Sequence, residues 1–183
     1  MTMQKQKLFV VSGPSGAGLG EIISEVFRRR SDVATVVPVT ARKMKEGEQD
    51  GVGFFFYDLD GWNALKESGD LLEATEFAGN DYGTSKRLVE EQLNAGKHVL
   101  LNLDVARAAQ LKRNMSEAVC IYIEPSSPGI LEERYRPNCR SAFELSARMD
   151  VAASQRAESA FCDVRISSDD LQAAAEKLCT LMD

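Results

Sequence analysis

The chain has very little histidine and no closely paired cysteines. Its single histidine is His98, and its four cysteines, at positions 120, 139, 162 and 179, form no Cys-x-x-Cys motif. This composition argues against a metal site built from cysteine and histidine, so we expect no metal ligands. One histidine also leaves little scope for catalysis by a Ser–His or Cys–His pair. Widely spaced cysteines are typical of reduced thiols, which predicts a cytoplasmic location.

Long hydrophobic runs and excess positive charge are also missing. No apolar stretch reaches the roughly 20 residues of a membrane-spanning helix, and the polar residues 1–7 lack the apolar core of a signal peptide. The formal net charge is -6. We therefore expect no nucleic-acid or membrane partner, and any anionic ligand must meet a local cluster of positive side chains.

What the sequence does contain is typical of a globular α/β protein. It has 183 residues, of which 44% are hydrophobic and 27% charged, enough for one domain with a substantial core. Short apolar segments alternate with segments of helical periodicity, a pattern that predicts a parallel core sheet flanked by helices. The expected strands are Leu8–Ser12, Ala34–Thr40, Val99–Asp104, Val119–Ile123 and Val164–Ile166. The expected helices are Glu21–Arg30, Ser85–Ala95, Val105–Asn114, Pro128–Tyr135, Ala142–Ser159 and Asp169–Met182.

Two segments depart from this alternation. The first has several glycines, the aromatic run 54–57, a helix around Asp60–Ser68, a strand at Leu71–Phe77 and a turn at Gly79–Asn80. It predicts a small mixed α/β subdomain inserted in the core. The second, Arg134–Ser141, carries three arginines around a proline and predicts an irregular, mobile basic connector.

The most informative stretch is Leu8–Gly20, where a Val-rich strand leads into a glycine-rich loop and then a helix. Backbone N–H groups converge on a bound anion at such a helix N-terminus. The phosphate-binding motif requires Gly, any four residues, Gly, then Lys and Ser or Thr. Gly13 and Gly18 keep this frame, but Leu19 stands at the lysine position and Gly20 at the hydroxyl position. Neither side chain supplies the cation for the terminal phosphates or the hydroxyl ligand for magnesium.

Two interpretations of this loop remain open. It is either an ordinary glycine turn or the loop of a nucleotide-kinase scaffold whose triphosphate site has become degenerate. The residues of the glycine-rich loop are Gly13, Pro14, Ser15, Gly16, Ala17, Gly18, Leu19 and Gly20.

The basic segment 40–48 is a candidate phosphate contact in an otherwise acidic chain. Arg42 offers a planar fork suited to phosphate, and Lys45 offers a point charge. A solvated basic loop would have the same composition, so this segment alone does not distinguish a phosphate site from an ordinary surface loop.

Segment 76–85 is a candidate purine contact. The carboxylate of Glu76 can accept from N–H donors, and the hydroxyls of Tyr82 and Thr84 can reach carbonyl or phosphate oxygens. Asp104 closes a predicted strand at the sheet edge where ligands bind in open α/β folds.

Taken in order, these motifs resemble those of the guanylate kinase family from the first strand to the last helix. The matching stretches are Ser12–Gly18, Thr40–Arg42 with Gly47–Glu48, Leu72–Phe77, Gly79–Ser85, Asn102–Asp104 and Pro125–Ser126. The resemblance implies the P-loop nucleoside-monophosphate-kinase fold in a single domain, 1–183. It further implies a core at about 1–34, 86–125 and 147–183, a GMP-binding subdomain at about 35–85, and a lid at about 126–146 that closes over ATP.

The resemblance also implies roles for individual residues. Glu76 and Asp104 match the carboxylates that accept from the guanine N–H groups, and Thr84 matches the hydroxyl near the guanine oxygen. Arg134 and Arg148 match arginines that reach the transferring phosphates, and they are the implied catalytic residues. The implied GMP-binding set is Thr40, Arg42, Lys45, Phe54, Glu76, Tyr82, Thr84 and Asp104.

Several positions depart from the family pattern. Pro38 stands in place of a phosphate-contacting serine, and Phe54 in place of a tyrosine whose hydroxyl is lost. Lys45 stands where the family has arginine. Asn102 replaces the first acid of an Asp-x-Asp pair, which weakens the negative field around magnesium. Arg136–Arg140 replaces the arginine–glycine run of the lid.

Three functions are compatible with this pattern. The first is binding of GMP, or a similar small phosphorylated ligand, by a pseudoenzyme with impaired or lost phosphoryl transfer. The second is an active guanylate kinase with an atypical loop, which alone would need ATP and Mg as cofactors. The third is an interaction module that binds a protein partner through the GMP site. Simultaneous loss of the loop lysine, the magnesium-binding hydroxyl and one aspartate favours the first.

Overall fold

The computed structural model describes residues 6–183, so the first five residues of the polar N-terminal segment lie outside the described part. Its centre is a five-stranded sheet in the order β2-β7-β1-β8-β9, in which every neighbouring pair is parallel. These strands are β1 (Leu8–Ser12), β2 (Val33–Ala34), β7 (His98–Asn102), β8 (Val119–Glu124) and β9 (Val164–Ser167). The predicted parallel core sheet is confirmed.

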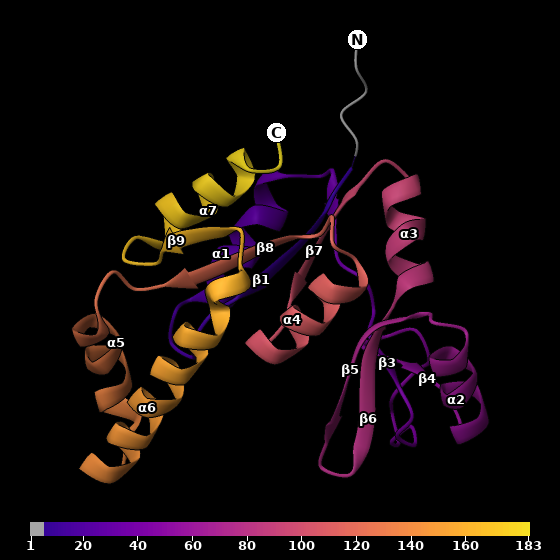
Figure 1. Ribbon diagram of the computed structural model, residues 1–183, viewed down its shortest axis with the longest axis horizontal. Coiled ribbons are helices and arrows are strands. Elements are labelled where there is room, and N and C mark those ends of the chain that lie inside the picture. The colour runs from indigo at the N-terminus through magenta and orange to yellow at the C-terminus, as the bar shows by residue number, and fades with distance from the viewer. Residues whose placement is uncertain (1–5) are drawn as a thin grey trace.

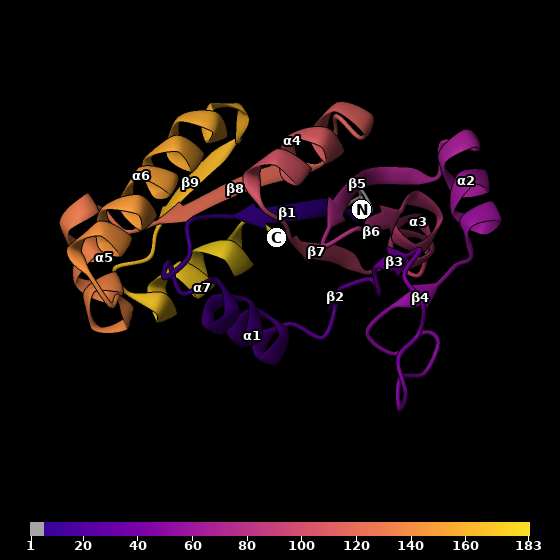
Figure 2. The same ribbon diagram turned by 90° about the horizontal axis from the view of Figure 1, so that it is seen from below.

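Helices cover both faces of this sheet (Figure 2). They are α1 (Leu19–Arg29) and α7 (Leu171–Thr180) on one face, and α3 (Lys86–Asn94) and α4 (Val105–Asn114) toward the other. The core contains one hydrophobic cluster on each face of this sheet, and strand β1 contributes residues to both because successive side chains of a strand point to opposite faces. Leu8 and Val10 pack in the cluster with α3 and α4, whereas Phe9 and Val11 pack in the cluster with α1 and α7. Within residues 6–183, no helix is both long and apolar enough to cross a membrane.

A second sheet lies beside the core, in the order β4-β3-β6-β5 (Figure 1). Its strands are β3 (Val39–Thr40), β4 (Phe55–Phe56), β5 (Leu71–Phe77) and β6 (Asn80–Ser85), and α2 (Leu59–Glu67) joins β4 to β5. The sheet is mixed because β3 pairs with β4 in parallel and with β6 antiparallel. The expected mixed α/β segment is therefore present.

A helical arm extends from the other side of the core (Figure 1). It consists of α5 (Pro128–Tyr135), the 3-10 turn η1 (Arg136–Asn138), α6 (Ala142–Glu158) and a second turn η2 (Ser159–Phe161). The prediction of an irregular connector from Arg134 onward was wrong for its first half. Tyr135 is buried in a cluster with Leu131 of α5 and Ala152 of α6, and this packing keeps the chain helical to the end of α5 and into η1.

The segment expected as one strand, Ala34–Thr40, is divided between the two sheets. β2 ends at Ala34 in the core, and β3 begins at Val39 in the mixed sheet. Pro38 lies between them, and proline cannot donate a hydrogen bond to a continuous strand ladder. Its carbonyl oxygen instead accepts from the Phe55 amide at 2.9 Å.

Candidate functional site

A hollow of about 520 Å³ lies between the two sheets, and we call it the inter-sheet cavity. Five of the predicted binding residues line it: Phe54, Glu76, Tyr82, Thr84 and Asp104. Arg107, which the sequence did not single out, lines it as well. Pro38 and Asn102, two of the positions that depart from the family pattern, also lie on its wall.

The carboxylates of this cavity come from different elements. Glu76 lies near the end of β5 and is exposed. Asp104 follows β7 and is the N-cap of α4, where its Oδ1 accepts from the Arg107 amide at 2.9 Å. This cap uses one oxygen of Asp104, so the other is available to a ligand.

Behind the cavity wall lies a buried ion pair. The side chain of Glu73 is 0% exposed and accepts from Nε and Nη2 of Arg107 at 2.6 and 2.8 Å. Oε1 of Glu73 also accepts from the Thr84 hydroxyl at 2.6 Å. Burial opposes the positive charge of Arg107, but pairing with Glu73 outweighs it and raises the pKa of Arg107.

Sequence reasoning missed Glu73 and Arg107 for a structural reason. The pairing of β5 with β6 shifts register between Leu71 and Glu73, and this irregularity buries both Leu72 and Glu73. In a strand with strictly alternating side chains, burial of Leu72 would leave its neighbour Glu73 facing outward, so the sequence does not predict a buried acid there. The only sequence signal that could have pointed to Arg107 is its position in the first turn of a helix that Asp104, a predicted site residue, caps.

The structure places the other predicted phosphate contacts beside the cavity, outside its lining. Arg42 donates to both oxygens of Glu48, at 2.7 and 2.6 Å, and its guanidinium lies 5.1 Å from the ring centres of Phe54 and Phe56. Hydrogen bonds from Arg42 lower the pKa of Glu48 to about 2. Thr40 is buried and donates to the Asp81 carbonyl.

Lys45 is exposed, and its backbone amide donates to Glu48 at 2.7 Å. The basic segment is therefore organised around one acid, Glu48, which contacts both Arg42 and Lys45.

The glycine-rich loop lines a second hollow of about 640 Å³, the loop cavity, together with Glu21, Arg134, Asp169 and Leu171. Gly18, at φ 81°, is the N-cap of α1 and provides no side-chain cap. The N–H groups of the first helical turn are therefore available to an anion. A Cβ atom at Gly13 would lie 2.1 Å from the Ile123 carbonyl oxygen, so only glycine fits there.

Two side chains of this loop differ from the phosphate-binding motif. Leu19 packs partly against the hydrophobic core, and Gly20 has no hydroxyl. Among the residues that line the loop cavity, Arg134 carries the only positive side chain. Residues 6–183 contain no group of three or more histidine, cysteine or acidic side chains that could hold a metal ion.

The two arginines implied as catalytic are both engaged by protein atoms. Arg134 donates to the carbonyl oxygens of Gly16 and Ser168, at 3.1 and 2.8 Å. Arg148 pairs with Glu144 at 3.0 Å, and its guanidinium lies 5.8 Å from the ring centre of Tyr135. Arg134 thus lies at the loop cavity, whereas Arg148 is outside its lining.

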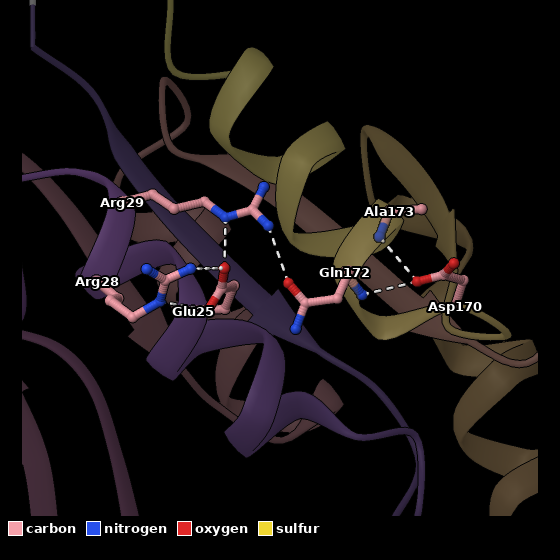
Figure 3. A network of polar contacts seen from close by, with 6 residues as sticks. All are labelled: Glu25, Arg28, Arg29, Asp170, Gln172 and Ala173. Carbon is pink, nitrogen blue, oxygen red and sulfur yellow. Dashed lines mark hydrogen bonds and ion pairs between the residues drawn. The ribbon is translucent and has the colours of Figure 1, made fainter.

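The arginines at the end of α1 do not replace the missing loop cation. Figure 3 shows Arg28 and Arg29 paired with Glu25, and Arg29 also donates to Gln172 of α7 at 2.9 Å. These hydrogen bonds lower the pKa of Glu25 to about 2. The cluster links the C-terminal end of α1 to α7, at the opposite end of α1 from the loop.

Comparisons with known proteins all lead to one family. A family model described as guanylate kinase matches residues 5–183. A guanylate kinase of Carboxydothermus hydrogenoformans is 37% identical over 177 residues, covering 96% of this chain and 87% of its own. One from Parasynechococcus marenigrum is 36% identical over 176 residues, covering 96% and 97%. The crystal structure of guanylate kinase from Anaplasma phagocytophilum, 24% identical, matches the fold with a TM-score of 0.66, covering 100% of this chain and 87% of its own.

Proposed function

The chain belongs to the guanylate kinase family, and on this basis we propose that it binds GMP or a related phosphorylated ligand, with its ATP-dependent phosphoryl transfer to GMP impaired or lost. One observation carries the proposal. The inter-sheet cavity has two carboxylates, Glu76 and Asp104, on its wall, while the neighbouring loop cavity has Leu19 and Gly20 where a cation and a metal ligand are required.

We assign the parts of the chain accordingly. The GMP-binding subdomain is about 35–85, the lid is about 126–146, and the core is about 1–34, 86–125 and 147–183. In support, the four strands of the mixed sheet lie within 35–85, and α5 with the turn η1 lies within 126–146.

In this assignment Glu76 and Asp104 bind the base of GMP. Guanine carries N–H donors at N1 and N2, and a carboxylate only accepts hydrogen bonds. The phosphate of GMP lies toward Arg42, whose guanidinium contacts the ring of Phe54, and Phe54 in turn packs against Tyr82 on the cavity wall. A phosphate bound there displaces Glu48 as the partner of Arg42, and Phe54 contributes its ring without a hydroxyl donor.

Phosphoryl transfer depends on positioned charge, with little covalent chemistry for the protein to perform. Loss of one preorganised contact to developing charge costs roughly 100- to 1,000-fold in turnover. Three such contacts are affected here, at Leu19, Gly20 and Asn102. Although these effects are not additive, we expect turnover to be reduced by several powers of ten. In this proposal ATP and Mg are needed only for the residual phosphoryl transfer to GMP, and GMP binding requires neither.

Calorimetry and a coupled assay test the proposal together. Titration with GMP is expected to give saturable binding, while titration with ATP and magnesium gives weak binding or none. ADP formation from ATP and GMP is expected to stay near background. Fast magnesium-dependent ADP formation would show an active guanylate kinase with an atypical loop, and absence of GMP binding would overturn the proposal.

A further inference from the structure

Two cysteines that lie far apart in the sequence meet just before the edge strand β9. Cys120 of β8 and Cys162, which follows η2, are 42 positions apart, yet their Sγ atoms lie 2.9 Å from each other. Cys120 is 1% exposed, whereas Cys162 is half-buried and packs against the same hydrophobic cluster. Both thiols are free. Neither residue lines the inter-sheet cavity or the loop cavity, so the pair is separate from the candidate ligand sites.

The main chain around the two thiols holds them in place. The Asp163 amide donates to the Cys120 carbonyl at 2.8 Å, and the Cys120 amide donates to Oδ2 of Asp163 at 2.8 Å. The Asp163 carboxylate is in turn paired with Lys112 of α4 at 2.9 Å. Just beyond this point β8 and β9 continue as parallel neighbours. A disulfide has an S–S bond of about 2.05 Å, so the two sulfur atoms need to approach each other by only about 1 Å.

The two thiols differ in reactivity. The thiolate is the nucleophilic form of cysteine. A hydrogen bond from the Cys120 thiol outweighs burial and lowers the pKa of Cys162, and the positive charges of Arg165 and Lys112 act in the same direction. The same pairing, together with burial, raises the pKa of Cys120. Cys162 is also the more exposed of the two, so it is the sulfur that a small oxidant meets first.

We propose that Cys120 and Cys162 are an oxidation site, at which a two-electron oxidant such as hydrogen peroxide forms a reversible intramolecular disulfide. The Cys162 thiolate attacks one peroxide oxygen and becomes a sulfenic acid, while the O–O bond breaks and the other oxygen leaves as hydroxide. The Cys120 sulfur then attacks the Cys162 sulfur, and the S–O bond breaks with loss of a second hydroxide. The two thiol protons convert both hydroxides to water, so two electrons pass from the sulfur atoms to the peroxide.

This disulfide fastens the helical arm to the core sheet. Residues 121–161, which include α5 and α6, lie between the two cysteines. A cross-link across a loop of this length removes conformational freedom from the unfolded chain. Because the sulfur atoms need little adjustment in the folded chain, oxidation is expected to raise Tm by about 5–10 °C.

Peptide mapping of the full chain after treatment with hydrogen peroxide tests for the cross-link. Trypsin places the two cysteines in the peptides 114–134 and 157–165. Oxidation is expected to join these two peptides, to lower the number of free thiols from four to two, and to raise Tm. Dithiothreitol is expected to reverse all three changes. The matched control Cys139→Ser/Cys179→Ser keeps the pair and is expected to form the same cross-link.

Two single variants test the order of the two steps. In Cys120→Ala, peroxide is expected to leave a sulfenic acid on Cys162, which dimedone traps. In Cys162→Ala, Cys120 is expected to stay reduced because it is buried. Neither variant, once shown to be folded by circular dichroism, is expected to gain Tm on oxidation.

Four results would overturn the assignment of this oxidation site. Oxidation could join other cysteines or separate chains, or it could carry Cys162 beyond sulfenic acid without a cross-link. All four thiols could survive a treatment that oxidises free glutathione in the same solution. A cross-link that forms but lowers Tm would show that the fold is distorted to make it, which contradicts a pair already positioned for a disulfide.

Discussion

The phenolic hydroxyl of Tyr135 donates a hydrogen bond to the carbonyl oxygen of Ser15 at 2.6 Å, which joins the last turn of α5 to the glycine-rich loop. Arg134, the preceding residue, donates to the carbonyl of Gly16. Burial raises the pKa of Tyr135, so its hydroxyl keeps its proton at neutral pH. Two side chains of the helical arm therefore hold the carbonyl groups of the loop.

Tyr135→Phe is expected to lower the free energy of unfolding by about 1 kcal/mol, because the Ser15 carbonyl loses its partner. Chemical denaturation measures this change. The matched control is Tyr122→Phe: Tyr122 is also buried, but its hydroxyl has no hydrogen-bond partner among residues 6–183. Removing that hydroxyl is expected to leave stability unchanged or to raise it slightly. Equal destabilisation by both variants would contradict the role given to the Tyr135 hydrogen bond.

The two ends of the glycine-rich loop differ in their tolerance of a side chain. At Gly13 a Cβ atom would lie 2.1 Å from the backbone oxygen of Ile123, which cannot move away without distorting β8. Gly13→Ala is therefore expected to destabilise the fold by about 3 kcal/mol or more. At Gly20, in the first turn of α1, a Cβ atom meets nothing within 4 Å, and Gly20→Ala is expected to stabilise by up to about 1 kcal/mol. Thermal or urea unfolding measures the stability of the two variants. Similar changes in their free energies of unfolding would contradict the difference in space at Gly13 and Gly20.

Much of the fold could be predicted because local signals agree with tertiary packing. The bounds Val105–Asn114 and Pro128–Tyr135 match the observed α4 and α5, since Asp104 caps the first and Pro128 begins the second. β6 was expected only as a turn and a polar segment. Asn80–Ser85 has weak strand propensity, and its extended form comes from pairing with β5 and β3 on either side.

The candidate site was predictable only in part. Glu76, Tyr82, Thr84 and Asp104 meet at one cavity, although the sequence placed only Glu76 and Asp104 at the ends of strands. The pair formed by Glu73 and Arg107 could not be inferred, because it depends on a register shift in β5 and on the side of β5 against which α4 packs. The engagement of Arg42 by Glu48 likewise depends on the path of the loop between them.

Glu48 is expected to titrate far below an ordinary glutamate. Its pKa is lowered from 4.5 to about 2, chiefly by hydrogen bonds from Arg42. A carboxyl group whose pKa is depressed in the folded state stabilises the fold above its unfolded pKa, and that contribution disappears as the pH falls. The stability difference between the unsubstituted chain and Glu48→Gln is therefore expected to be constant above about pH 5 and to shrink as the pH falls toward 2. Carbon NMR of the Glu48 carboxyl measures the midpoint directly, and a midpoint near 4.5 would contradict the ion pair.

Restoring the two missing side chains of the loop is expected to restore phosphoryl transfer. Gly20 has open space at its Cβ position, and Leu19 is only partly buried, so Leu19→Lys/Gly20→Ser fits without rearranging the loop. With a cation and a hydroxyl in place, ADP formation from ATP and GMP is expected to rise by about 100-fold or more in a coupled assay. The matched control, Leu19→Met/Gly20→Ala, changes the same positions without adding charge or a hydroxyl and is expected to stay at the parent rate. An equal rise in the control would contradict the electrostatic explanation. No rise in the lysine–serine variant would place the main defect elsewhere, at Asn102 or in the engaged arginines Arg134 and Arg148.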